Sequence, residues 1–435
     1  MEIFQIFVQV IAIVIFCYFP QYYLNFFNIK QQSIIEKISI GLIFNIFILL
    51  LLSFISQKNF NLIFIILTII FCINLFFFVI ENWGLKILNT KLFFLFIFVI
   101  VFSFDLANNL KLGWDTQNFW ILKTLNFLEG GDVYNLKNIT RHDYPHLGAF
   151  IWAIYTKISF LEYEYLGRIF YIFFYCLAIF SIAEFLNFND VKKILFSSII
   201  IILTYNISLF NGYQEVLLFS IFTLFSKYFY LIIKKNIPRN FLIFHSILII
   251  ILLLISTWIK NEGMFFSSIF VFLMLCLPKK SSLFKLSVFF SYILIIILRF
   301  FIYEEIGLDV STLAQNNYVN LNLLSLESYF MLDRILLIFK YLLFGILSNL
   351  IYLISLFMIL FMFFCRKVET NLFFYLASLF LNFWLIFCFY IYTTVPLQWH
   401  LKVSAERVLF EVLGIYLIPI VIFINVFFKK TPKIL

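Results

Sequence analysis

Charge is scarce in this sequence. Only 12% of its 435 residues are charged, 64% belong to the set Ala, Val, Ile, Leu, Met, Phe, Trp, Tyr and Cys, and the mean hydropathy is +1.06. A soluble domain usually has about 25% charged and about 45–50% apolar residues. The composition therefore excludes a soluble enzyme, a disordered chain and a secreted disulfide scaffold.

Cysteine, glycine and proline are also sparse. The six cysteines lie inside apolar runs without a Cys-x-x-Cys pair, which argues against disulfides and structural zinc. Gly (12) and Pro (7) are few whereas Phe (65) is abundant, a bias typical of an AT-rich genome, so we interpret most Phe side chains as lipid-facing or core residues. The first apolar run, Ile3 to about Tyr18, lacks a basic leader and a cleavage site, and we expect a retained helix.

Long apolar runs recur from end to end, and they predict an all-α, polytopic membrane protein. A transmembrane β-barrel would instead show alternating strands of roughly ten residues. We predict about thirteen spans, near residues 3–27, 38–56, 60–80, 92–105, 167–187, 194–210, 216–233, 240–258, 263–277, 286–302, 343–365, 371–392 and 408–428.

Basic residues gather in alternate loops, which by the positive-inside rule are cytoplasmic. The C-terminus is then inside and the N-terminus outside, and Lys227 and Glu184 are expected to snorkel from cytoplasmic helix ends. The net charge of +9 reflects this orientation, and because the basic residues are scattered we expect no nucleic-acid partner. These loops hold 17 of the 31 basic residues: Lys30, Lys37, Lys86, Lys91, Lys192, Lys193, Lys234, Lys235, Arg239, Lys279, Lys280, Lys285, Arg366, Lys367, Lys429, Lys430 and Lys433.

The opposite, exoplasmic face contains the two long loops, 105–166 and 303–342, and the short connections 211–215, 259–262 and 393–407. Three of the four histidines lie there with most of the acids. This concentration predicts chemistry at the exoplasmic interface. Segments 146–160 and 329–342 have helical patterns, and we expect two helices lying along the membrane surface.

The first candidate residue is Asp115, which follows Trp114 and precedes a helical pattern over 118–129 that stops at Gly130-Gly131. Asp is a favoured N-cap, which is the simplest interpretation. A carboxylate near the headgroups could also take a proton from an incoming nucleophile.

Further candidates lie in the later outer connections. Glu215 begins an apolar helix, where it could merely complement the helix dipole, and Lys260 and Glu262 could form a local ion pair. Arg407, which follows His400, would begin the final span against the positive-inside bias and needs an anionic partner such as a lipid phosphate.

A cluster of metal-ligand residue types, His142, Asp143 and His146, precedes the first surface helix. Its spacing is not a recognised ligand pattern, so a divalent metal is conceivable but not required.

In order and topology, these motifs resemble the GT-C superfamily of integral-membrane glycosyltransferases, which includes protein O-mannosyltransferases and lipid A aminoarabinose transferases. Those proteins have an acid at the start of the first large exoplasmic loop, followed by a helix ending in Gly, and Asp115 with Gly130-Gly131 matches this. The remaining motifs are similar too: Tyr144-Pro145-His146-Leu147, Gly212-Tyr213-Gln214-Glu215, Lys260-Asn261-Glu262-Gly263 and Ser404-Ala405-Glu406-Arg407.

The resemblance implies a module at 92–435, preceded by N-terminal transmembrane helices at 1–91, that transfers a sugar from a polyprenyl-phosphate donor to a glycan, lipid or protein acceptor. Asp115 would be the general base of an inverting transfer, with Lys260 and Arg407 holding the donor phosphate and His400 assisting. Glu215 and Glu262 would orient these cations or the sugar, and Trp114, His142, Asp143 and His146 would support the acceptor. No metal or other cofactor is implied. We expect a bacterial inner-membrane location with the site facing outside.

Two other classes stay open. A lipid-linked oligosaccharide polymerase or ligase would rest its chemistry on Arg and His in place of Asp115. A transporter or flippase would carry charges within its spans and often internal repeats, and we find no repeat.

Overall fold

The computed structural model describes residues 2–55, 60–82, 89–159, 161–233, 238–276, 282–308, 332–365, 370–393 and 395–428. This part of the chain is helical and contains no β-strand, which confirms the predicted all-α class. The N-terminal helices are α1 (Glu2–Phe16), α2 (Gln21–Phe26), α3 (Ile34–Ser53), α4 (Phe60–Asn82) and α5 (Thr90–Asn108).

The segment after α5 folds into short helices. They are the π-helix η2 (Thr116–Trp120), α6 (Ile121–Leu128), the 3-10 helix η3 (Val133–Asn138) and α7 (Leu147–Ile158). The central helices are α8 (Glu164–Ala183), α9 (Asp190–Thr204), η4 (Ile207–Phe210), α10 (Glu215–Ile233), α11 (Arg239–Ile259), α12 (Asn261–Leu275) and α13 (Ser282–Ile306). The last group is α16 (Leu332–Ser348), α17 (Leu350–Phe364), α18 (Thr370–Ile391), α19 (Leu397–Leu413), η6 (Gly414–Tyr416) and α20 (Leu417–Phe427).

Ten helical segments of the described chain are long and apolar enough to cross a membrane, and the pair α16–α17, bent by 83°, would make an eleventh. The protein is therefore a multi-pass membrane protein. The predicted count of thirteen also includes α9 and α12, which have 15 residues each. A straight span needs about 20 residues, so these two fall short of that length.

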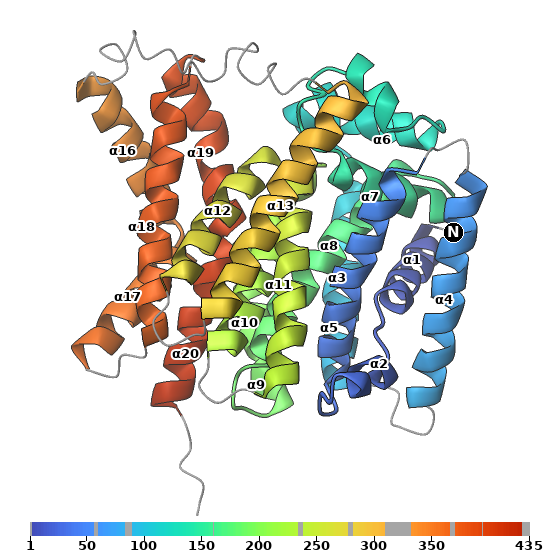
Figure 1. Cartoon of the computed structure of the whole chain (residues 1–435), viewed down its shortest axis with the longest axis horizontal. Helices are drawn as coiled ribbons and strands as arrows, with labels where there is room; N and C mark the ends of the chain where they lie inside the picture. The colour runs from blue at the N-terminus through green and yellow to red at the C-terminus, as the bar shows by residue number, and fades with distance from the viewer. Residues whose placement is uncertain are drawn as a thin grey trace, which may run out of the picture.

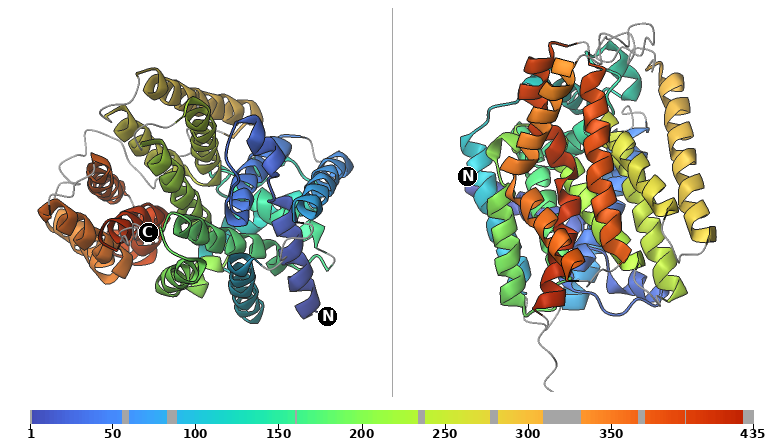
Figure 2. Two further views of the ribbon diagram at one scale, coloured as in Figure 1. Left: turned by 90° about the horizontal axis from the view of Figure 1, so that it is seen from below. Right: turned by 90° about the vertical axis from the view of Figure 1, so that its left-hand side faces the viewer.

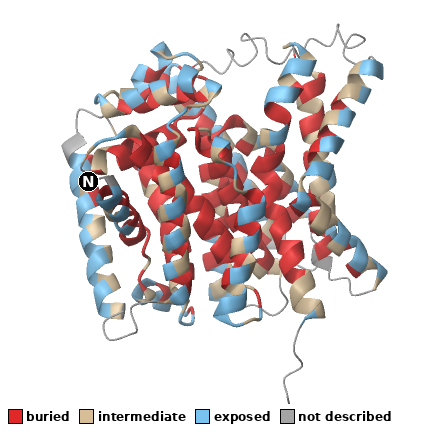
Figure 3. Cartoon of the chain, turned by 180° about the vertical axis from the view of Figure 1, so that it is seen from behind, coloured by how far each residue is buried: buried red, intermediate tan, exposed pale blue. Residues whose placement is uncertain are grey.

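The helices run roughly side by side, with α1 to α5 on one side of the molecule and α16 to α19 on the other (Figures 1 and 2). Between them, α10 packs against α8, α11 and α19. All residues of the most apolar 18-residue stretch of α8 are buried, whereas only 17% of the corresponding stretch of α4 is buried. Figure 3 shows this contrast between the centre and the edge of the molecule. Short helices including α6 cover one end of the bundle, at the top of Figure 1, which we call the α6 end.

The prediction of a surface helix at 146–160 is wrong in its placement. A helix forms there, α7, but all residues from Leu147 to Thr156 are buried. It packs against α3, α6 and α8 because its sequence is apolar on every side, apart from Lys157 near its end. The amphipathic helix that covers this end is α6 instead.

The predicted boundary between a surface helix at 329–342 and a span at 343–365 is also wrong. The break lies at Asn349, whose side chain caps α17 by accepting a hydrogen bond from the Ile351 amide at 3.0 Å. The helix α16 packs against α18 and α19, so it is part of the bundle. Residues 329–331 lie outside the described part.

Lys227 does not snorkel. Its side chain is buried and donates to Glu36 on α3 and to Ser181 on α8. A buried ammonium ion needs such a counter-charge, which the helix α3 provides. Glu184, at the C-terminal end of α8, pairs with Lys91 at 2.8 Å and with Lys193 at 3.4 Å.

Candidate functional site

Five residues singled out in the sequence meet in one charged cluster. Arg407 Nη2 lies 2.7 Å from Asp115 Oδ2, and Arg407 Nε lies 3.5 Å from Glu215 Oε1. Lys260 Nζ lies 3.2 Å from Glu215, 3.3 Å from Glu262 and 2.6 Å from Glu411. We call these six residues (Asp115, Glu215, Lys260, Glu262, Arg407 and Glu411) the acidic cluster. Four carboxyl groups share two cations in it.

Asp115 is held by the turn that enters η2. The Gly113 amide donates to the Asn211 carbonyl at 3.0 Å, and the Trp114 amide donates to the Tyr213 hydroxyl at 3.1 Å. The side chain of Asp115 makes no capping hydrogen bond, so the simple N-cap interpretation is wrong. Its carboxylate is 22% exposed and points to Arg407. The π-helix that follows is a rare form that is frequent at functional sites.

Glu215 is placed by the hairpin that precedes α10. Gly212 has a φ of +83°, and a side chain there would collide with Thr116, so only glycine suits this turn. Glu215 is the first residue of α10, as predicted, and is buried. The turn thereby brings the Glu215 carboxylate to Arg407, which also binds Asp115 before η2.

Lys260 joins α11 to α12 in extended backbone, with φ −155° and ψ 152°. Burial alone would lower the pKa of Lys260, but Glu215, Glu262 and Glu411 raise it well above the usual value. The ammonium group is therefore protonated and bound within the cluster. The predicted local pair with Glu262 is present but is only one of three contacts.

Arg407 and Glu411 lie four residues apart on α19 and so on the same face of that helix. The prediction that Arg407 begins the final span is wrong, because α19 already starts at Leu397. Of the charged side chains of α19, Arg407 and Glu411 face the cluster, whereas Lys402 and Glu406 are exposed. The Arg407 guanidinium also lies over the Tyr213 ring, 4.2 Å from its centre.

Three carboxylate oxygens of the cluster are buried without a hydrogen-bond donor within the described structure. They are the Oε2 atoms of Glu215, Glu262 and Glu411. Buried acceptors are normally satisfied, so these oxygens can accept hydrogen bonds from a ligand. A neutral ligand could donate such hydrogen bonds to these oxygens from its hydroxyl groups.

Other candidates lie outside this cluster. His400 Nδ1 is 2.9 Å from Thr393 Oγ1, and its ring packs against Tyr390. Asp143 is bound by Arg141 at 3.1 Å, and His142 is half-buried. Trp114, in the turn that precedes η2, is 58% exposed.

His146 is a core residue. Its Nε2 lies 2.8 Å from Ser53 Oγ, and its ring packs against Phe54, Phe127 and Trp258. Burial lowers the pKa of His146 to about 3, so the ring is neutral. In the described part of the chain, no group of three His, Cys, Asp or Glu side chains could hold a metal ion.

Sequence analysis missed Glu411, Lys123 and Arg299. Glu411 lies inside the apolar run predicted as the last span, and an ionisable residue within a span is by itself a functional signal. Lys123 is fully buried on α6 and donates to the Tyr144 carbonyl at 2.5 Å. Arg299 interrupts the apolar run of α13, which was a similar signal.

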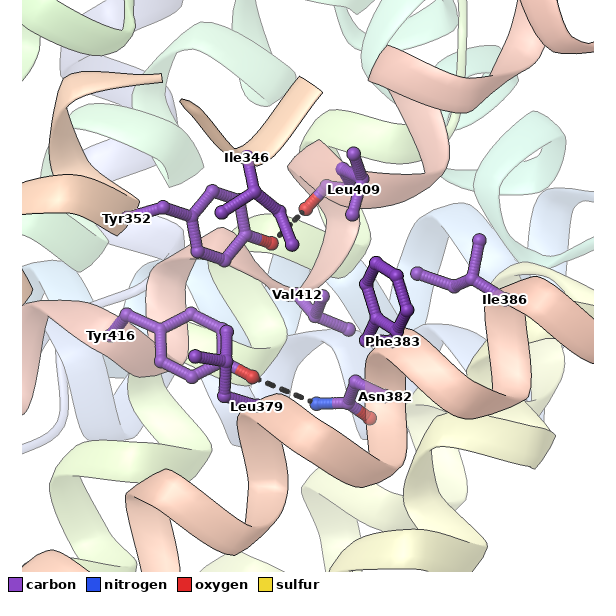
Figure 4. Close-up of a pocket in the computed structure, with 9 residues that line it drawn as sticks. All are labelled: Ile346, Tyr352, Leu379, Asn382, Phe383, Ile386, Leu409, Val412 and Tyr416. Atoms are coloured by element: carbon purple, nitrogen blue, oxygen red, sulfur yellow. Dashed lines mark hydrogen bonds between the residues drawn. The ribbon is translucent and has the colours of Figure 1, made fainter. Parts of the chain in front are cut away.

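A small cavity lies away from the acidic cluster, on the other face of α19. Its empty space is about 180 Å³, and its lining includes Tyr352, Asn382, Leu409 and Tyr416 (Figure 4). Tyr352 donates to the Leu409 carbonyl at 2.7 Å, and Asn382 donates to the Tyr416 hydroxyl at 3.1 Å. These bonds join α17, α18, α19 and η6.

In comparisons with known proteins, the chain matches no family model, no curated protein and no solved structure.

Proposed function

We propose that the protein is an integral-membrane glycosyltransferase of the GT-C type. It would transfer a sugar from a polyprenyl-phosphate donor to an acceptor hydroxyl on a glycan, lipid or protein. The observation that carries this proposal is the acidic cluster, in which Asp115, two cations and three further carboxylates converge from distant segments. Such a site offers a base, positive charge for a leaving phosphate and acceptors for sugar hydroxyls.

Asp115 is the proposed general base. It takes the proton of the acceptor hydroxyl while that oxygen attacks the anomeric carbon, and the bond from this carbon to the phosphate oxygen breaks with inversion. The lipid phosphate leaves with the electron pair. A positioned base typically contributes about 10²–10⁴ in rate.

Arg407 and Lys260 are the proposed partners of the leaving phosphate, with His400 assisting from the preceding turns of α19. In the structure Arg407 binds Asp115 at 2.7 Å, so the carboxylate that would take the proton is occupied by this ion pair. A donor phosphate that draws Arg407 away would free Asp115 for the acceptor. Glu215 and Glu262 then orient Lys260. Their Oε2 atoms, which have no hydrogen-bond donor in the described structure, accept hydrogen bonds from the sugar hydroxyls.

The proposed location follows from the charge of the loops. Asp115 of the cluster directly precedes η2 and α6, so the cluster lies toward the α6 end, which the positive-inside rule assigns to the outside. We propose the bacterial inner membrane, with the segment 1–91 as N-terminal helices and 92–435 as the catalytic module.

Asp115→Asn tests the proposal directly. The amide keeps the size of the side chain but cannot accept the proton, so transfer from a polyprenyl-phosphate sugar should fall by at least about a hundredfold. Donor binding should persist because it depends on Arg407 and Lys260. Both are measured on purified protein, by product formation and by equilibrium binding of the donor.

The matched control is Asp105→Asn. Asp105 is an exposed acid near the same end that accepts a hydrogen bond from Tyr205 at 2.6 Å, and its variant should retain normal transfer. Normal transfer by Asp115→Asn as well would contradict the general-base mechanism and favour a polymerase or ligase that uses Arg and His.

A further inference from the structure

A buried arginine, Arg299, lies within the membrane-spanning helix α13 and outside the acidic cluster. Arg299 is 5% exposed and lies on the inner face of α13 with Tyr292 and Tyr303. Its neighbours Leu298 and Phe300 are exposed, as expected for a helix that faces lipid. Arg299 lies seven residues before the end of α13, about 10 Å along the helix axis.

The described partners of Arg299 carry no negative charge. Its guanidinium donates to Asn261 Oδ1, lies 3.7 Å from Met264 Sδ, and stacks near the rings of Trp258 and Tyr303 at 6.0 and 5.1 Å. No carboxylate among the described residues lies within 4 Å of it.

Most other buried cations of the described structure have a carboxylate partner. Lys227 meets Glu36, Arg168 meets Glu164 at 2.6 Å, and Lys260 meets three acids. Asp143 lies beyond Asn261, which donates to its backbone carbonyl at 3.5 Å, but its carboxylate is already bound by Arg141. An unpaired charge inside a membrane protein is costly and usually marks a ligand site.

We infer that Arg299 binds the phosphate group of a membrane lipid at the junction of α12 and α13. A planar guanidinium suits a phosphate because it donates two parallel hydrogen bonds. The site is separate from the acidic cluster, where each cation already faces carboxylates. The inference does not depend on glycosyl transfer.

Polar groups next to Arg299 link α12 to α13. Ser268 on α12 is exposed, and its hydroxyl lies 3.0 Å from that of Tyr292, which donates to the Met264 carbonyl. Met264 is half-buried and covers Arg299. A lipid phosphate that binds Arg299 would displace this flexible side chain.

The experiment compares lipids by the rise in melting temperature that they produce in detergent-purified protein. The probes are a short-chain polyprenyl phosphate, phosphatidylglycerol and diacylglycerol, tested on the unaltered protein, Arg299→Lys and Arg299→Met. Arg168→Lys is the matched control, because it changes a buried arginine that already has a carboxylate partner.

Phosphate-bearing lipids should stabilise the unaltered protein and the control, whereas Arg299→Lys should bind them about tenfold more weakly. Arg299→Met should lose the response to phosphatidylglycerol and the part of the polyprenyl phosphate response that does not depend on Arg407 and Lys260. This variant should melt no lower than the unaltered protein without lipid, since it removes a buried charge that has no carboxylate partner among the described residues. A response to polyprenyl phosphate alone would identify a carrier lipid, and a response to both phosphates would identify bulk phospholipid.

Two results would overturn the inference. One is an equal response to diacylglycerol, which has no phosphate. The other is an unchanged phosphate response in Arg299→Met together with a lower melting temperature without lipid, because Arg299 would then serve only to pack α13 against Asn261.

Discussion

Within the acidic cluster, each cation stabilises more than one acid. Arg407 lies between Asp115 and Glu215, and Lys260 lies among three carboxyl groups. Removing one partner of a buried pair leaves the other charge uncompensated, at a cost of about 3–5 kcal/mol. Alanine variants of these cations would therefore change both stability and function, and variants that conserve the charge are more informative.

Arg407→Lys should weaken donor use about tenfold while the protein remains folded. It keeps the positive charge beside Asp115 but loses the paired donors that suit a phosphate. The measurement is the KM for the donor together with the melting temperature. Lys402→Ala, which removes an exposed cation from the same helix, serves as the control and should change neither. An unaltered donor KM in Arg407→Lys would mean that Arg407 only pairs with local acids.

Lys123 should make stability depend on pH. Burial lowers the pKa of Lys123 to about 7, against about 10.5 in an unfolded chain. Between these values the unfolded state binds more protons, so the stability of the protein should rise with pH from about 7 to about 10. Below pH 7 both states are protonated and the full cost of burying the charge is present.

Lys123→Met removes this contribution. Its melting temperature should exceed that of the unaltered protein most at pH 6, and the difference should shrink as the pH rises to about 9.5. A difference that does not vary with pH would show that Lys123 is not buried as a titrating amine.

Among the helices, hydropathy located most spans but misjudged those with an internal polar face. The helix α19 was predicted as a connection up to Arg407, because the sequence cannot show that Arg407 and Glu411 meet opposite charges of other segments inside the bundle. The opposite error affected α7, where moderate length suggested a surface helix and tertiary packing buried it.

Gly414 should be essential for the packing of α10 against η6. A methyl group there would lie 1.9 Å from Thr223 Oγ1 and 2.7 Å from the Phe219 carbonyl. Because backbone cannot move aside cheaply, Gly414→Ala should destabilise the protein by about 1–3 kcal/mol in thermal unfolding. Gly345→Ala is the control and should cost less, since it would meet only the end of the Leu409 side chain. Equal melting temperatures for both variants would contradict this.

For the whole molecule, the central prediction is its orientation. Asn138 is exposed on η3, which follows α6, and Asn187 is exposed in the connection from α8 to α9, whose basic residues the positive-inside rule assigns to the inside. In a background with the exposed Cys72 and Cys276 replaced by Ser, Asn138→Cys should react with an impermeant thiol reagent added to intact cells, and Asn187→Cys should not. The reverse pattern would place the acidic cluster on the cytoplasmic side.

The sequence by itself determined the class of this protein, its multi-pass character and five members of the acidic cluster. Hydropathy is a local property of 20-residue windows, and the cost of placing charge in a membrane makes each exception visible. The short, ordered motifs located Asp115, Glu215, Lys260, Glu262 and Arg407 without any knowledge of distances.

Only the tertiary structure decided how those residues pair and which others join them. Contacts between distant segments bring Arg407 to Asp115 and Glu411 to Lys260. They also leave Arg299 without a counter-charge among the described residues. Such contacts follow from how α10, α11 and α19 pack together. A local pattern cannot specify them, because the energy of a buried charge depends on the neighbours that the fold brings to it.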